Sequence, residues 1–199
     1  MLVVNQHFHF IFLEILSHYS CKTSGAKVVV VGDSIAAGGR HWDFEIGLLP
    51  LRTRNLAGNG YTIAQIAGQA ANAKKYKPEC LVVFGGTNDA FQLRECRTSL
   101  ERIREDVEKL LDAAAPIPVV YVLPPPTEYA DVNGTLETVR GEIVAVLKER
   151  SVPFVDSVQL LGNDQRLLKP EYSSDGVHLK AAAYDLLGGK IRKIIAEKK

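Results

Sequence analysis

Cysteine is scarce in this sequence, and no apolar run is long enough to cross a bilayer. The three cysteines, Cys21, Cys80 and Cys96, form no CxxC pair and are odd in number, which disfavours a disulfide framework or a zinc site and indicates free thiols. No stretch reaches about 18 consecutive apolar residues, so we expect no integral membrane span. The 24 basic side chains nearly balance the 23 acidic ones and form no basic stripe, so nucleic acid is not an expected partner.

The common motifs for nucleotide and metal cofactors are also missing. The glycine-containing segment 32–39 matches neither GxGxxG nor GxxxxGK(S/T), which disfavours binding of a dinucleotide or a nucleoside triphosphate. No HExxH motif and no cluster of cysteine and histidine residues offers a zinc site. The enzyme classes that depend on these motifs are therefore disfavoured.

The first 24 residues differ from the rest of the chain. They are apolar and aromatic, but polar residues interrupt them and no lysine or arginine occurs before Lys22. Because a secretory signal carries positive charge near its start, an extra N-terminal helix or arm is favoured over a targeting segment. For the same reason a cytoplasmic location is slightly favoured over a secreted one, and both alternatives stay open. We expect residues 25–199 to form one domain.

Strand-like and helix-like segments alternate along residues 25–199. Strands are expected at residues 27–31, 51–56, 80–84, 118–123 and 153–156, and helices at 41–49, 61–75, 97–115, 135–150 and from 178 toward 196. Strands that are separated by helices imply right-handed βαβ crossovers. The sequence therefore predicts a three-layer α/β domain, in which a parallel sheet lies between two layers of helices.

A run of valines ends shortly before a serine. Val28 to Val31 are typical of a strand that is buried on both faces of a parallel sheet. Gly32 permits a sharp turn, and Ser34 follows at the carboxyl end of the strand, where open α/β sheets bind their ligands. Ser34 is therefore a candidate nucleophile, although a lone serine in this place is more often a turn or cap residue.

Three other segments are expected at the same edge of the sheet, because the carboxyl ends of parallel strands lie together. Residues 55–62 follow the second predicted strand, residues 85–89 follow the third, and residues 175–178 precede the last helix. Acyl transfer requires a nucleophile, a base, a carboxylate that orients the base, and donors for the oxyanion. Together with Ser34, these segments contain residue types that suit each role.

The four segments resemble, in order, the motif blocks of the SGNH (GDSL) hydrolases. The blocks are Gly32-Asp33-Ser34-Ile35, residues 55–62 with their glycines, Gly86-Thr87-Asn88-Asp89 and Asp175-Gly176-Val177-His178. The resemblance covers the chain from about Lys27 to its end. It implies a flavodoxin-like α/β/α sandwich with a five-stranded parallel sheet, residues 25–199 as the catalytic domain, and an activity that needs no metal or organic cofactor.

The resemblance also implies roles for individual residues. Ser34 corresponds to the nucleophile, His178 to the general base and acid, and Asp175 to the carboxylate that orients the imidazole. An aspartate three residues before a histidine, with Gly176 between them, lets one loop present both side chains to the same serine.

The resemblance also implies an oxyanion hole that combines backbone and side-chain donors. They are the N–H of Ser34, the side-chain amide of Asn88 and the N–H of a glycine. Gly60 is preferred for the third donor because the spacing from Asn55 to Gly60 and Thr62 fits the second block best, and Gly58 stays open as the alternative.

Several nearby residues have structural interpretations. Asp33 is expected to cap or brace its loop. For Asp89 a structural role, as an Asx turn or cap, is as compatible with the sequence as a functional one. Segments 90–96 and 124–134, which includes Tyr129, are expected to be loops that shape the substrate pocket.

The sequence thus predicts a serine esterase that acts on a carboxylic ester. The substrate is expected to be a small-molecule, lipid or carbohydrate ester: a short acyl ester, a lysophospholipid, a thioester or an O-acetylated sugar. An acyltransferase with the same Ser-His-Asp site and a non-catalytic binding module on the same fold are the alternatives. The oligomeric state stays open.

Overall fold

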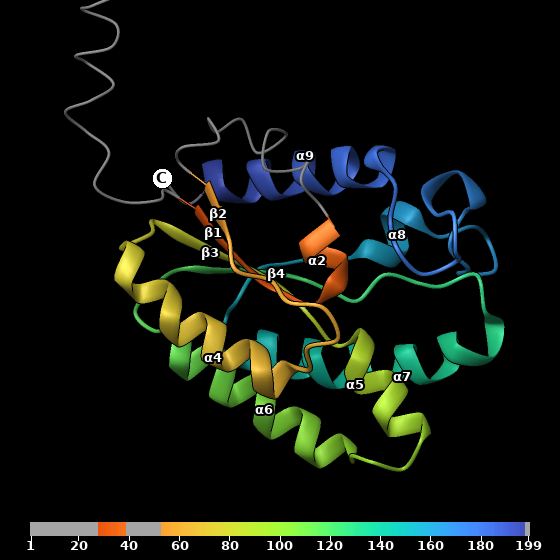
Figure 1. The fold of residues 1–199 in the computed structure, drawn as a ribbon, viewed down its shortest axis with the longest axis horizontal. Coiled ribbons are helices and arrows are strands. Elements are labelled where there is room, and N and C mark those ends of the chain that lie inside the picture. The colour runs from red at the N-terminus through yellow and green to blue at the C-terminus, as the bar shows by residue number, and fades with distance from the viewer. Residues whose placement is uncertain (1–27, 39–52, 198–199) are drawn as a thin grey trace, which may run out of the picture.

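The computed structural model describes residues 28–38 and 53–197 of the chain. Within these residues, five parallel strands form one sheet in the order β2-β1-β3-β4-β5 (Figure 1). The strands are β1 (Val28–Gly32), β2 (Thr53–Asn55), β3 (Cys80–Phe84), β4 (Val119–Val122) and β5 (Phe154–Val155). The predicted five-stranded parallel sheet is confirmed. The helix expected at 41–49 and the segment 1–24 lie outside the described residues.

Helices cover both faces of the sheet, as Figure 1 shows. One layer consists of α4 (Ile63–Ala73), α5 (Thr87–Arg94), α6 (Leu100–Ala114) and α7 (Ala130–Glu149). The other contains α2 (Ser34–Gly38), α8 (Ser157–Leu161) and α9 (Ala181–Glu197). Two short 3₁₀ turns, η2 (Lys74–Tyr76) and η3 (Pro170–Tyr172), complete the described elements. The three-layer α/β/α architecture is thereby confirmed.

The valines of β1 lie between two hydrophobic cores. Successive side chains of a strand point to opposite faces, so Val29 and Val31 join the core beneath α4, α6 and α7. Val28 and Val30 join the core beneath α2, α8 and α9. All four are fully buried, which explains why this strand has no polar residue before its end.

The amphipathic helix α6 shows how the sequence pattern fixes the outer layer. Ile103, Val107 and Leu110 repeat at helical spacing and are buried against the sheet. The helix begins after Ser99, whose hydroxyl accepts the N–H of Arg102 and so satisfies one of the free donors of the first turn.

Two predicted loops are wrong in part, since a helix occupies part of each. Residues 90–96 belong largely to α5, and α7 begins at Ala130 rather than at Thr135. In α5 the polar residues Thr87 and Asp89 are buried, so the helix lacks the apolar stripe that reveals an amphipathic helix. In α7 the first turns contain Gly134, a weak helix former that obscured the start of the helix.

None of the helices in the described part of the chain is both long enough and apolar enough to cross a membrane.

Candidate active site

The candidate nucleophile stands where β1 turns into α2. Ser34 is the first residue of α2, and it follows Gly32 and Asp33 at the carboxyl end of β1. Gly32 lies opposite Phe84 of β3, and a Cβ on Gly32 would sit 2.4 Å from the Phe84 carbonyl oxygen. Only glycine fits this close approach between the two strands. The approach brings the Ser34 turn beside the segment that follows β3.

A continuous hydrogen-bonded chain connects Ser34, His178 and Asp175. The Ser34 Oγ and the His178 Nε2 are 3.1 Å apart, and the His178 Nδ1 and the Asp175 Oδ2 are 2.7 Å apart. Although 144 positions separate Ser34 from His178 in the sequence, the fold joins them directly. The three predicted side chains therefore lie in the order that a Ser-His-Asp relay requires.

The carboxylate of Asp175 is held by its own loop. Its Oδ1 accepts the backbone N–H groups of Val177 and His178 at 2.9 and 2.7 Å, while its Oδ2 faces the imidazole. These N–H donors and the bond to the His178 ring hold the pKa of Asp175 well below its ordinary value. Asp175 is therefore ionised at neutral pH. It accepts a hydrogen bond from Nδ1–H and leaves Nε2 of His178 as the acceptor that faces Ser34.

The structure distinguishes the two glycines considered for the oxyanion hole. The N–H of Gly58 donates to the carbonyl of Gly32 at 3.0 Å, so this donor is already engaged. Gly60 has a φ of +75°, is exposed, and lines the same hollow as Ser34 and His178. The geometry thus favours Gly60 over Gly58, in agreement with the preference from the sequence.

The side chain of Asn88, near the start of α5, is fixed by the segment that contains Gly60. Its Nδ2 donates one hydrogen bond to the carbonyl of Tyr61 at 3.0 Å. Since an amide nitrogen carries two hydrogens, this bond leaves one of them for another acceptor.

We expect Asn88→Ala to lower kcat for ester hydrolysis by about 10²- to 10³-fold with a small change in KM, because an oxyanion donor acts mainly in the transition state. Steady-state kinetics on a p-nitrophenyl ester measures both constants. Gln92→Ala, on the same helix at a partly buried position, is the matched control and is expected to behave as the wild type. An unchanged kcat in Asn88→Ala would show that Asn88 is not an oxyanion donor.

The triad opens onto a hollow with a volume of about 750 Å³. Small side chains and backbone form its described walls, which consist of Ser34, Ala37, Gly38, Asn59, Gly60 and His178. Ser34, Gly60 and His178 therefore line one hollow together.

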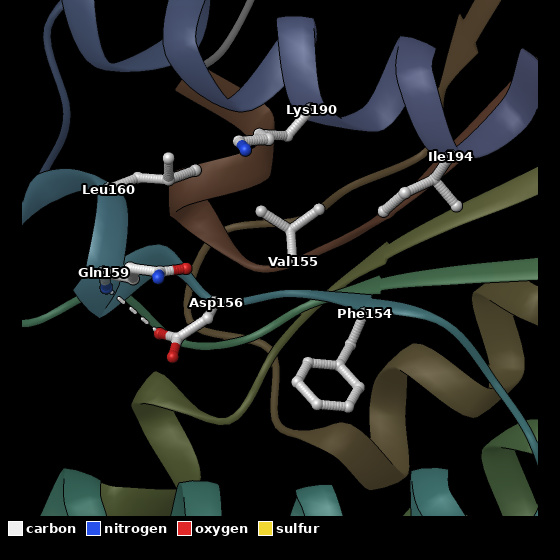
Figure 2. Close-up of a pocket in the computed structure, with 7 residues that line it drawn as sticks. All are labelled: Phe154, Val155, Asp156, Gln159, Leu160, Lys190 and Ile194. Atoms are coloured by element: carbon white, nitrogen blue, oxygen red, sulfur yellow. Dashed lines mark hydrogen bonds between the residues drawn. The ribbon is translucent and has the colours of Figure 1, made fainter.

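A second hollow, of about 370 Å³, lies at the edge strand β5 between α8 and α9 (Figure 2). In Figure 2 the side chain of Lys190 extends from α9 toward Leu160, and that of Ile194 extends toward Val155. Asp156 accepts the backbone N–H of Gln159. The complete lining is Phe154, Val155, Asp156, Gln159, Leu160, Lys190 and Ile194. It contains none of the predicted catalytic residues and no pairing of a nucleophile with a base.

Sequence reasoning missed Gln69, whose side-chain amide makes two hydrogen bonds with the backbone of the turn before the nucleophile. Gln69 Oε1 accepts the N–H of Gly32 at 2.8 Å, and Gln69 Nε2 donates to the Gly32 carbonyl at 3.2 Å. A signal was present, because Gln69 falls on the buried face of α4, between Ile66 and Ala70 in the sequence. A buried amide on such a face needs a polar partner, and the backbone of the catalytic turn supplies it.

The two carboxylates beside the site have structural roles. Asp33 Oδ1 accepts the N–H of Ile35 at 3.0 Å, which confirms that Asp33 braces its loop. The carboxylate of Asp89 accepts the N–H of Ile63 at 3.1 Å and so caps the start of α4 from a neighbouring helix. Burial raises the pKa of Asp33 to about 7 and that of Asp89 to about 6.

The raised pKa of Asp33 predicts a pH-dependent loss of stability. The folded state holds the Asp33 proton more tightly than the unfolded state, whose pKa is near 3.8. Between these two values the free energy of unfolding therefore falls as pH rises, by up to about 1.4 kcal/mol per pH unit. In Asp33→Asn this contribution disappears, since the amide does not titrate.

Urea unfolding of the wild type and of Asp33→Asn at pH 5 and pH 7 measures this effect. The wild type is expected to lose on the order of 2 kcal/mol more than the variant over this interval. Parallel losses in the two proteins would show that Asp33 ionises normally in the folded state.

In residues 28–38 and 53–197, no three side chains of histidine, cysteine, aspartate or glutamate gather closely enough to hold a metal ion.

Comparisons with known proteins identify the family of the chain. The model of the GDSL-like lipase/acylhydrolase family matches residues 30–186. That range includes Ser34, Gly60, Asn88, Asp175 and His178. A search of curated proteins found no match.

Solved structures with the same fold cover most of the chain. A GDSL-like lipase from Bacteroides thetaiotaomicron is 20% identical with a TM-score of 0.71, over 94% of this chain and 98% of that one. A putative acylhydrolase from Bacteroides fragilis is 19% identical with a TM-score of 0.74, over 94% and 96%. A variant of an acetyl xylan esterase from Geobacillus stearothermophilus is 21% identical with a TM-score of 0.67, over 86% and 95%.

Proposed function

Because the chain belongs to the GDSL-like lipase/acylhydrolase family, we propose that it hydrolyses a carboxylic ester through an acyl-enzyme on Ser34. The observation that carries this proposal is the hydrogen-bonded chain from Ser34 Oγ through His178 to the Asp175 carboxylate. This arrangement pairs a nucleophile with a base, and the base with a group that orients it, which is the geometry of nucleophilic acyl transfer.

In the acylation step, Ser34 Oγ attacks the ester carbonyl carbon while His178 Nε2 takes the hydroxyl proton. Asp175 stabilises the imidazolium that forms, and the tetrahedral oxyanion receives hydrogen bonds from the N–H of Ser34, the N–H of Gly60 and the amide of Asn88. The intermediate then collapses, and His178 gives its proton to the departing alkoxide, which leaves as an alcohol.

Deacylation repeats these roles with water in place of Ser34. His178 Nε2 removes a proton from a water molecule, which attacks the acyl carbon of the ester on Ser34. The second oxyanion occupies the same donors, and its collapse releases a carboxylic acid while the proton on His178 returns to Ser34 Oγ. The enzyme is regenerated without an external oxidant, reductant or metal.

A short acyl group is the substrate class that we propose. The described walls of the catalytic hollow, such as Ala37, Gly38 and Asn59, include no large apolar side chain against which a long alkyl chain would pack, so an acetyl group fits them better. One protein of similar fold is an acetyl xylan esterase, so an O-acetylated sugar is among the esters to test.

Hydrolysis of p-nitrophenyl acetate, butyrate and octanoate, with acetate release from acetylated xylan in parallel, tests the proposal. We expect kcat/KM to be highest for the acetate ester and to fall with chain length. A folded wild-type protein that hydrolyses none of these substrates would overturn the esterase proposal and favour acyl transfer to another alcohol. A preference for octanoate would overturn the short acyl group alone.

A further inference from the structure

Ser173 lies at the start of the loop that carries both Asp175 and His178, and its hydroxyl makes contacts at both ends of this loop. The side chain is almost fully buried, with 3% of its surface exposed. Its Oγ accepts the N–H of Gly176 at 2.9 Å and lies 3.3 Å from the N–H donor of Asp175. It also lies 2.7 Å from the carbonyl oxygen of His178.

The single hydroxyl hydrogen of Ser173 has two acceptors within reach. Asp175 Oδ1 is 3.3 Å away, and this oxygen already accepts the N–H groups of Val177 and His178. The carbonyl of His178 is closer, at 2.7 Å, which is the usual length of an O–H···O bond. The geometry therefore assigns the hydrogen to the carbonyl of His178.

From these contacts we propose that Ser173 is a positioning residue, whose hydroxyl ties the backbone of His178 to the turn at Asp175 and Gly176. The proposal rests on the esterase function argued above. A shift of either backbone changes the contact between the imidazole and the carboxylate, or the contact between the imidazole and Ser34. Catalysis is sensitive to displacements of this kind, because the reacting groups must stay aligned within a fraction of an ångström.

Other contacts hold the loop on the protein independently of Ser173. The N–H of Glu128 donates to the carbonyl of Gly176, and Tyr129 Oη donates to the carbonyl of Asp175, each at 2.9 Å. Both donors belong to the segment that precedes α7, so the loop is anchored from outside. Removal of the Ser173 hydroxyl is therefore expected to loosen the triad without unfolding the loop.

The neighbouring Ser174 provides a matched control. It is exposed, belongs to the same loop and makes no hydrogen bond through its side chain to the described residues. Ser174→Ala removes one hydroxyl from the loop, as Ser173→Ala does, but it leaves the contacts of Ser173 in place.

The test compares kcat, KM and the thermal midpoint of the wild type, Ser173→Ala, Ser174→Ala, Asp175→Asn and the double variant Ser173→Ala/Asp175→Asn on p-nitrophenyl acetate. We expect Ser173→Ala to lower kcat by about 10- to 100-fold with KM within about twofold of the wild type. Ser174→Ala is expected to match the wild type. In the Asp175→Asn background, Ser173→Ala is expected to lower kcat by a smaller factor than in the wild type, because the contact between the imidazole and the carboxylate is already lost.

An unchanged kcat in Ser173→Ala, or the same factor lost in both backgrounds, would overturn the positioning role. A change confined to KM would do so as well. These outcomes differ from a failure of the proposed function, in which the wild type itself hydrolyses no ester.

If Ser173→Ala does not fold, Ser173→Thr and Ser173→Val take its place, since they have nearly the same shape and only threonine keeps the hydroxyl. The threonine variant is expected to have the higher kcat by about tenfold or more, and equal values would overturn the proposal.

Discussion

Ser34→Ala is expected to lower kcat for ester hydrolysis by about 10⁴- to 10⁶-fold, the largest effect of any substitution in this chain. Without Oγ no acyl-enzyme forms, and the imidazole of His178 loses its hydrogen-bond partner at 3.1 Å. The residual rate comes from the oxyanion donors acting on direct attack by water. Steady-state kinetics on p-nitrophenyl acetate measures the loss.

The thermal midpoint of Ser34→Ala serves as the control for folding. Ser34 is only half-buried and its side chain contacts solvent in the catalytic hollow, so the midpoint is expected to stay close to that of the wild type. A folded variant that retains more than about a hundredth of the wild-type kcat would exclude Ser34 as the nucleophile.

The second largest effect is expected for Asp175→Asn, with a loss of about 10⁴-fold in kcat. An asparagine keeps the oxygen that accepts the N–H groups of Val177 and His178, so the loop retains its conformation. The atom that then faces the imidazole is the amide nitrogen, which donates and cannot accept the hydrogen bond from Nδ1–H. The developing imidazolium then lacks the negative charge that stabilises it in the transition state.

Asp175→Asn is measured on the same ester, together with the far-ultraviolet circular dichroism spectrum of the variant. The spectrum is expected to be unchanged and KM to remain within a few-fold, so that the loss lies in kcat. A kcat within about tenfold of the wild type would mean that another group orients His178.

Much of the fold follows from the sequence, because its main elements have strong local patterns. The valines of β1 contact two cores, and this double burial is what makes the strand recognisable as an uninterrupted apolar run. The buried positions of α6, such as Ile103 and Val107, repeat at the period of a helix. Where a pattern is lacking, as in α5 with its buried Asp89, the helix was mistaken for a loop.

In the candidate site, too, the residues that belong to local motifs were predicted from the sequence, and those that depend on contacts between distant segments were not. The motif blocks predict which side chains take part, and the parallel topology brings Ser34 and His178 together. The choice between Gly58 and Gly60 depends on whether each N–H is already engaged, and the partner of Gly58 is the carbonyl of Gly32 on another segment. Such a contact exists only in the folded chain, so the sequence left it open.

The residues that support the site were the hardest to foresee. Gln69 acts through the backbone of a glycine 37 positions away, and nothing in its own segment indicates that partner. Ser173 acts within its own loop, but its role depends on the turn at Gly176, whose φ is +80°. In both cases the signal is a buried polar side chain, and only the fold identifies the partner that such a side chain needs.

Covalent labelling of the intact protein with a biotin-linked fluorophosphonate, followed by mass spectrometry, tests most directly whether Ser34 is an activated nucleophile. We expect one adduct per chain in the wild type, with loss of fluoride and attachment to the Ser34 peptide. We expect no adduct in a folded Ser34→Ala variant. Labelling at another residue, or a folded wild type that remains unlabelled, would contradict the claim that Ser34 is a nucleophile activated by His178 and Asp175.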